Sequence, residues 1–413
     1  MLERSFRRRC AIRRFREGPA GPFLDGYAAA LFAQGQSVDS CRRHLRAAAH
    51  VGQWAVRRGI PFSALDENVL ARFVWHLPRC QCHPERKRPG YGRSPFQARR
   101  FLRHLRETGI AAHTPGPARP TLVIEFEAWM RDRAGLAETT IANSKRVVGP
   151  FLDALGEDPA RFDAAGVRAF VLRFVGRHAP HSPGWVTTSI RCFLRFLIMR
   201  GQCSPELRDA VPRIPTWRQA RLPNYLPRKD VEQIISASIC EHYRGTALRN
   251  RALLLLLARV GLRAHEVVGL RFDDIDWRAG RLRVLGKGRR EGWLPLPQDA
   301  GDAILGYLEA RPAAPTDYIF LTSRAPLKPF TSGGLRMVVR LAIERAGIQA
   351  PSRGSHLFRH SLATSLLRDG ATLDAIGAVL RHCDVDTTAL YAKVDVDALR
   401  QVAQPWPGTE VTP

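Results

Sequence analysis

The stretch from His356 to Tyr391 constrains this chain more than any other, because it joins two His/Arg pairs to a tyrosine. It begins with His-Leu-Phe-Arg-His at positions 356–360 and continues through an apolar run to Leu-Arg-His at positions 380–382. A His and an Arg three residues apart share one face of a helix, so both can contact the same small anion. We expect His382 and Tyr391 on separate helices. This combination indicates attack of a tyrosine on a phosphodiester.

The residue types match that chemistry. A free tyrosine has a pKa near 10, so forming the phenolate at neutral pH costs roughly 4 kcal/mol. An imidazole is a suitable base for that proton, and guanidinium groups bind the charged oxygens of the attacked phosphate. The leaving 5′-oxygen needs a proton, which calls for a general acid.

Two upstream segments supply the missing groups. Arg263 lies at a predicted helix start within residues 261–270, and Glu266 is placed to orient it. Lys287 lies at the tip of a predicted β-hairpin between the alternating segments Arg281–Leu285 and Gly292–Leu296. A lysine at such a tip is a mobile acid that can reach a DNA groove.

In their order and spacing, these residues resemble the tyrosine recombinase (phage integrase) family. The resemblance implies that Tyr391 is the nucleophile, that Arg263 and Arg359 clamp the scissile phosphate, and that Lys287 is the general acid. It further implies that His356 accepts the proton of Tyr391 and that His382 hydrogen-bonds the phosphate. The residues that carry the resemblance are Arg263, Lys287, His356, Arg359, His382 and Tyr391.

Glu266 and His360 match supporting positions of the family. Two positions depart from its pattern: Arg381 stands where Gly is usual before His382, and Phe358 where Leu is usual. Because neither position touches the phosphate in the family's pattern, we expect the departures to affect local packing more than activity.

The resemblance implies a mainly α fold with a small β-sheet, in which helical N-terminal DNA-binding domains precede a mixed α/β catalytic domain. It also implies a site-specific recombinase, the integrase or transposase of a mobile element. Such a protein acts on two specific sites in double-stranded DNA, as a homo-tetramer or together with related recombinases of the same element, and not at a membrane. Since transesterification conserves the phosphodiester energy, we expect no cofactor. The alternatives are a type IB-like DNA topoisomerase with the same nucleophile and a DNA-binding accessory subunit with little activity.

Composition agrees with a polyanionic partner. The chain has 413 residues, and its 64 Lys and Arg against 38 Asp and Glu give a net charge of +26. Neutralisation of phosphates supplies much of the affinity of proteins for DNA. Codon bias toward Arg offers another explanation for the excess.

The N-terminal residues lack the apolar core of a signal peptide. The eight cysteines show no paired framework, so we expect a protein of the reducing bacterial cytoplasm, associated with the nucleoid. Cys80, Cys82 and His83, with His76 nearby, offer donor atoms for a metal ion. They lack the second half of a zinc ligand set, so we expect no metal site.

We expect five parts: an N-terminal helical unit at 1–110, a core-binding domain at 120–207, a basic Pro-rich linker at 208–228, a catalytic domain at 229–393, and a tail at 394–413. In the first part, Val38–Arg57 and Glu67–His76 are the clearest predicted helices. The tail contains a short amphipathic segment, Asp395–Ala403, which either docks on a neighbouring protomer or folds back on its own domain.

The first two parts share sequence features that predict a tandem repeat. Arg72-Phe73-Val74 recurs at 173–175, and Phe101-Leu102-Arg103 recurs at 193–195, each time followed by a glycine eight residues after the Phe. Chance similarity between Arg-rich helices is the alternative. Basic side chains predicted to contact DNA outside the catalytic set are Lys145, Arg146, Arg191, Arg195, Arg289 and Arg290.

The catalytic part is predicted to open with a helix at Val231–Ser238 that Asp230 caps, and to hold a short strand at Tyr318–Leu321. Further helices are predicted at Thr246–Val260, Ala264–Leu270, Gln298–Arg311 and Ser332–Ala346.

Overall fold

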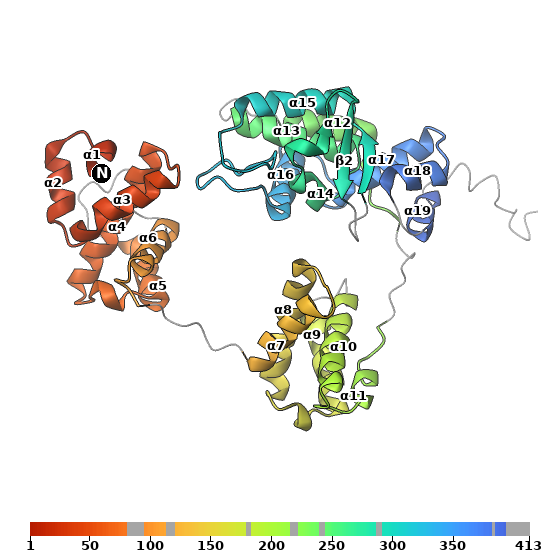
Figure 1. Cartoon of the computed structure of the whole chain (residues 1–413), viewed down its shortest axis with the longest axis horizontal. Coiled ribbons are helices and arrows are strands. Elements are labelled where there is room, and N and C mark those ends of the chain that lie inside the picture. Colours follow the sequence, from red (N-terminus) through yellow and green to blue (C-terminus); the bar gives the residue numbers. More distant parts are fainter. Residues whose placement is uncertain are drawn as a thin grey trace, which may run out of the picture. The chain divides into compact units, whose positions relative to one another are not determined.

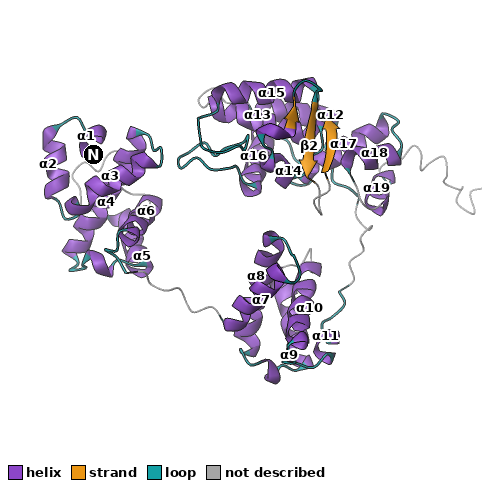
Figure 2. Cartoon of the chain, in the orientation of Figure 1, coloured by secondary structure: helices purple, strands orange, loops and turns teal. Residues whose placement is uncertain are grey.

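The computed structural model is mainly helical, with one small sheet among the residues that it describes (Figures 1 and 2). It describes residues 1–80, 95–112, 120–178, 183–214, 222–238, 244–285, 291–381 and 385–393. The predicted fold class is confirmed. None of the helices in these ranges combines the length and the apolar character that crossing a membrane requires.

Buried hydrophobic side chains form separate clusters in the first, middle and last parts of the chain. These clusters span residues 2–111, 123–211 and 226–358, and a small fourth cluster lies in 363–391. Contacts between Cα atoms separate residues 114–220 from the rest of the chain.

The N-terminal part contains helices whose starts are set by side-chain caps. Ser37 accepts a hydrogen bond from the Ser40 amide before α4, and Asp66 accepts one from the Val69 amide before α5. The two predicted helices are confirmed with the bounds expected. The elements are α1 (Leu2–Ser5), α2 (Arg9–Glu17), α3 (Gly21–Ala33), α4 (Val38–Arg57), η1 (Phe62–Ala64), α5 (Glu67–His76), η2 (Leu77–Arg79) and α6 (Pro95–Glu107).

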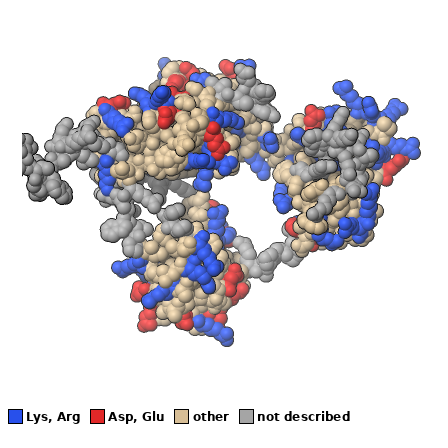
Figure 3. Space-filling view, turned by 180° about the vertical axis from the view of Figure 1, so that it is seen from behind, with Lys and Arg blue, Asp and Glu red and all other residues tan. Residues whose placement is uncertain are grey.

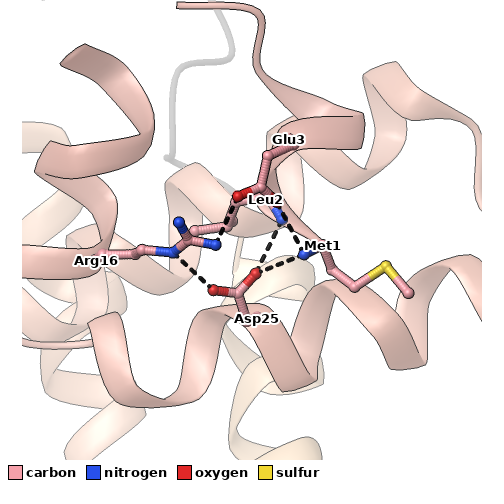
Figure 4. A network of polar contacts seen from close by, with 5 residues as sticks. All are labelled: Met1, Leu2, Glu3, Arg16 and Asp25. Atoms are coloured by element: carbon pink, nitrogen blue, oxygen red, sulfur yellow. Dashed lines mark hydrogen bonds and ion pairs between the residues drawn. The ribbon is translucent and has the colours of Figure 1, made fainter. Parts of the chain in front are cut away.

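A polar network joins α1, α2 and α3 (Figure 4). Asp25 accepts hydrogen bonds from the amino group of Met1 at 2.8 Å and from the Leu2 amide at 3.0 Å. Arg16 bridges Asp25 at 3.0 Å and Glu3 at 2.7 Å. Because these charged groups are solvent-exposed, we assign the network a minor role in stability.

The middle part packs its helices around an aromatic core. An apolar stripe at helical spacing on α10 faces this core: Ile190, Phe193, Leu194 and Leu197 are buried, and Ile198 is half-buried. The elements are α7 (Thr121–Asp132), α8 (Glu138–Leu155), η3 (Pro159–Arg161), α9 (Ala164–His178), α10 (Gly184–Met199) and α11 (Glu206–Asp209).

The first and middle parts bury side chains at corresponding positions. In α4, positions 44, 47, 50, 51, 54 and 55 are buried, as are positions 141, 144, 147, 148, 151 and 152 in α8, with identical spacing. The same holds for positions 98, 101, 102 and 105 of α6 and positions 190, 193, 194 and 197 of α10. Gly109 and Gly201 follow with φ of 73° and 68°, the left-handed conformation that ends many helices. These matches support the prediction of two related units.

The C-terminal part surrounds a three-stranded antiparallel sheet of order β1-β2-β3. Arg281 pairs with Pro295 and Leu285 with Glu291, so the predicted hairpin is confirmed. The elements are α12 (Arg228–Ala237), α13 (Arg244–Arg259), α14 (Ala264–Gly269), η5 (Phe272–Asp274), β1 (Ile275–Asp276), β2 (Arg281–Leu285), β3 (Glu291–Pro295), α15 (Gln298–Ala310), α16 (Ser332–Arg345), α17 (His356–Arg368), α18 (Leu373–Leu380) and α19 (Val385–Ala392).

Two expectations for the C-terminal part were wrong. Helix α12 begins at Arg228 after Pro227, so Asp230 lies in its first turn and is not its cap. Residues 318–321 form no strand; Tyr318 and Leu321 make only isolated bridges, to Arg271 and Pro329. The predicted tail helix at 395–403 lies outside the described residues.

Candidate active site

The charged side chain of Arg359 is buried, and it joins two segments of the site by hydrogen bonds to their backbones. It projects from α17, is 3% exposed, and donates hydrogen bonds to the carbonyl oxygens of Gly261, at 2.6 Å, and Leu380. Gly261 has φ of 65°, and a Cβ there would lie 2.9 Å from Leu362 and Leu380, so only glycine fits this approach. Burial lowers the pKa of Arg359 to about 10, so the group stays charged at neutral pH.

Glu266 holds Arg263 at the start of α14. Its carboxylate accepts the Arg263 backbone N–H at 2.7 Å and the Arg263 Nη1 at 3.0 Å. The Glu266 side chain is fully buried, whereas the Arg263 side chain is 25% exposed. The carboxylate therefore fixes the orientation of a guanidinium group that remains accessible to an anion.

Arg381 is the residue that sequence reasoning missed. It ends α18 in the left-handed conformation, with φ of 53°, and its Nη2 donates to the same Glu266 carboxylate at 2.7 Å. Its Nε and Nη1 are buried without a hydrogen-bond partner in the described structure. The signal in the sequence is the replacement of a usual Gly, which predicts an effect on local packing more than on activity. The site thus gathers three arginines, Arg263, Arg359 and Arg381, around one carboxylate.

Tyr391 pairs with His360 across α19 and α17. Its hydroxyl lies 2.8 Å from His360 Nδ1, and its ring packs in a small cluster with Ala363, Ile376 and Leu380. The Tyr391 side chain is 1% exposed. The nucleophile predicted from the sequence is therefore a core residue in the DNA-free chain.

Burial holds both partners of this hydrogen bond neutral. It raises the pKa of Tyr391 to about 12, against an opposing effect of Arg359. Burial, with the charges of His356 and Arg359, lowers the pKa of His360 to about 4. Both shifts oppose transfer of the proton from Tyr391 to His360 while the two side chains are buried.

His356 occupies the first position of α17 and is exposed. Partial loss of hydration and the charges of Arg359 and Arg263 lower its pKa. Its ring lies 6.4 Å from the His360 ring, and among the described residues no hydrogen bond joins it to Tyr391. His360 makes the hydrogen bond to Tyr391, and the role of His356 as proton acceptor stays a prediction. We call His356, His360 and Tyr391 the tyrosine cluster.

Lys287, Arg289, Arg290 and His382 lie outside the described residues. In the middle part, Lys145 forms an ion pair with Glu127 at 2.9 Å, and Arg191 donates to the Val211 and Pro212 carbonyl oxygens. Arg146 and Arg195 are exposed. On the face in Figure 3, Lys and Arg side chains lie on every part of the chain, and the acidic side chains of the middle part gather toward its lower edge.

The chain is similar to known proteins along most of its length. The model of the phage integrase family matches residues 224–397. The putative integrase/recombinase y4rA of Sinorhizobium fredii (strain NBRC 101917 / NGR234) is 38% identical over 410 residues, which cover 96% of this chain and 97% of the relative. Tyrosine recombinase XerD of Listeria monocytogenes serovar 1/2a (strain ATCC BAA-679 / EGD-e) is 32% identical over 296 residues, which cover 68% of this chain and 96% of the relative.

A solved structure gives the same fold. The crystal structure of the XerH site-specific recombinase bound to palindromic difH substrate, a post-cleavage complex, matches with a TM-score of 0.54. The match covers 80% of this chain and 93% of that chain at 15% identity. At this identity the match establishes the fold alone.

Proposed function

Because the chain belongs to the phage integrase family of tyrosine recombinases, we propose that it cleaves and rejoins DNA strands at specific sites through a 3′-phosphotyrosine on Tyr391. The observation that carries the proposal is that Arg359 ties the segment beside Arg263 to the end of α18 by donating to the Gly261 and Leu380 carbonyl oxygens, while the Tyr391 ring lies in one apolar cluster with Leu380. Attack on a phosphodiester requires a tyrosine and guanidinium groups in one site.

In the proposed step, the Tyr391 oxygen attacks the scissile phosphorus. The bond from this oxygen to phosphorus forms, the bond from phosphorus to the 5′-oxygen breaks, and Lys287 donates a proton to the departing 5′-oxygen. Arg263 and Arg359 bind the charged oxygens of the phosphate, and His382 adds a hydrogen bond. Attack by the 5′-hydroxyl of a partner strand reverses the step and releases Tyr391.

The two histidines of the tyrosine cluster have different proposed roles. His360 holds the Tyr391 hydroxyl in the DNA-free chain, where the ring is buried. Tyr391 has to leave this position to reach DNA, and His356 is exposed at the mouth of the same helix. His356 therefore accepts the proton once the tyrosine has moved.

The proposed partner is double-stranded DNA carrying two recombination sites, bound by a homo-tetramer. The setting is a mobile genetic element whose integrase or transposase this chain is, acting on the nucleoid in the cytoplasm. The basic residues Arg146 and Arg195, exposed on the middle part, contribute contacts to the DNA backbone.

The test uses the full chain and end-labelled duplexes spanning the DNA that flanks its gene. A sulfur atom at the bridging 5′ position of candidate sites makes a leaving group that needs no general acid, so the covalent product accumulates. We expect a denaturant-resistant protein–DNA adduct, its position located by sequencing of the fragment. Lys287→Ala should lose cleavage of ordinary DNA and retain cleavage of the sulfur substrate.

The same duplexes separate the alternatives. Exchange of strands between two labelled duplexes supports recombination. Nicking and resealing without exchange would support a topoisomerase, and DNA binding without any adduct would support an accessory subunit.

A further inference from the structure

Three donor side chains meet in the N-terminal part, away from the residues of the proposed active site. His50 projects from the middle of α4, His76 is the last residue of α5, and Cys80 follows η2. One donor atom from each lies within 4.8 Å of the other two, and Cys80 Sγ lies 3.1 Å from His50 Nε2. We call these residues the cysteine cluster.

The cysteine cluster lies in an apolar environment. His50 is 5% exposed and Cys80 is 6% exposed. The ring of Phe73 packs edge-on against His50 with centroids 5.1 Å apart, and Trp54 lies 6.2 Å from His76. An apolar shell around donor atoms limits the access of solvent to a bound metal ion.

Helix α8 of the middle part has no histidine among its buried residues, and it can be aligned with α4 in the register that also pairs Gly59 with Gly156 after the two helices. In the matching burial pattern of α4 and α8, His50 corresponds to Val147, which is fully buried. The neighbouring positions match in character, since Val51 corresponds to Val148 and Trp54 to Phe151. An apolar residue satisfies the packing at this position, so an imidazole facing a thiol calls for a separate explanation.

We propose that His50, His76 and Cys80 bind one zinc ion, with a fourth position open to water or another donor. Zinc favours nitrogen and sulfur donors in tetrahedral geometry, with Zn–N of about 2.0–2.1 Å and Zn–S of about 2.3 Å. Such bonds place neighbouring donors roughly 3.5 Å apart, so the present spacing needs only small side-chain rotations. On binding, the Cys80 thiol releases its proton to solvent and the thiolate coordinates the metal.

The electrostatic surroundings are compatible with this site. Burial, assisted by the charges of Arg58 and Arg57, lowers the pKa of His76, which favours the neutral imidazole that coordinates metal. Both arginines are exposed, so solvent screens their repulsion of a cation. The bound ion ties α4 to the end of α5. This proposal does not depend on the proposed DNA chemistry.

The experiment uses the full chain without an affinity tag. Zinc is removed with a chelator, returned by titration in competition with a chromogenic chelator, and replaced by cobalt(II) for spectroscopy. We expect one zinc per chain and, with cobalt, a thiolate-to-metal charge-transfer band. Failure of the wild-type chain to compete for zinc, or a cobalt spectrum without thiolate absorption, would overturn the proposal.

Variants locate the ion. Cys80→Ser should remove the thiolate band and weaken zinc binding by more than about 100-fold, since loss of a ligand should exceed the effect of losing a supporting contact. The matched control is Cys41→Ser, because Cys41 is also buried in this part, on α4; it should retain the band and the affinity.

Zinc bound with wild-type affinity by Cys80→Ser would show that the ion sits elsewhere, for example on the catalytic histidines. If Cys80→Ser does not fold, His76→Gln at a less buried ligand replaces it, with weaker zinc binding expected and unchanged binding contradicting the site.

Discussion

The tyrosine cluster and the cysteine cluster both use histidines, yet their neighbours suit ligands of opposite charge. In the tyrosine cluster, His356 and His360 lie in the field of Arg359, so the site is built to receive an anion. In the cysteine cluster, His50 and His76 face a thiol within an aromatic shell, which suits a cation. Burial lowers the pKa of a histidine in each cluster. The groups next to a histidine, more than the burial of its ring, therefore determine which kind of ligand the site suits.

The largest effect is expected from Tyr391→Phe, which keeps the ring of the tyrosine cluster and removes the attacking oxygen. The covalent adduct should fall by at least about 10⁴-fold, while DNA binding persists. Adduct formation is measured on denaturing gels beside Tyr318→Phe as a control, which should behave as wild type. Survival of the adduct in Tyr391→Phe would move the nucleophile elsewhere.

A smaller loss of cleavage rate is expected from substitution of the two histidines of the tyrosine cluster, and its size should differ between them. If His356 accepts the proton, His356→Ala should slow cleavage by about 10²–10³-fold and change the pH dependence of the rate. His360→Ala should have the weaker effect, because His360 holds the resting tyrosine. Single-turnover cleavage across a pH series measures both the rate of each variant and its pH dependence. The opposite ranking would assign the proton transfer to His360 in its present position.

Acid should destabilise the tyrosine cluster through His360, whose folded pKa of about 4 lies below its ordinary value. The unfolded chain takes up the proton first, so this contribution is complete above about pH 6.5 and is lost as the pH falls toward about 4. The loss amounts to roughly 3 kcal/mol. Chemical unfolding of wild type and His360→Gln at both ends of this range measures the difference. Equal pH slopes in the two proteins would contradict the prediction.

The smallest effect is expected at Arg381, which adds a third positive charge near the tyrosine cluster. Arg381→Gly should reduce cleavage by about tenfold and be more stable than Arg381→Ala by about 1 kcal/mol, since both lose the ion pair with Glu266 and only glycine adopts the left-handed conformation without strain. Arg381→Ala loses the charge and keeps the strain, whereas Arg381→Lys keeps both. We expect activity to follow charge and thermal stability to follow backbone strain. If Arg381→Gly cleaved DNA at the wild-type rate, Arg381 would have no role in cleavage.

Local patterns in the sequence predicted most of the fold. The helical pattern predicted α4 and α5 with their observed bounds, and alternation predicted the β2–β3 hairpin. The predicted cap at Asp230 failed because Pro227 fixes the start of α12 three residues earlier.

Contacts between distant segments were not predictable in this way. The ion pair of Arg381 with Glu266 joins residues 115 positions apart, and the contact of His50 with Cys80 joins residues 30 apart. Neither pair lies within one periodic segment. The short Cys80–His83 motif showed only part of the donor set, because His50 comes from another helix.

If Tyr391 is the nucleophile, as we propose, holding it as a core residue makes the protein latent. Its ring completes the small cluster of Ala363, Ile376 and Leu380, which is distinct from the main core of the C-terminal part. The reactive conformer is then a minor population, and the observed rate is reduced by the fraction of chains that occupy it. DNA that binds only the open conformer raises that fraction, so the substrate itself releases the nucleophile. A free chain meets other phosphodiesters with its tyrosine hidden.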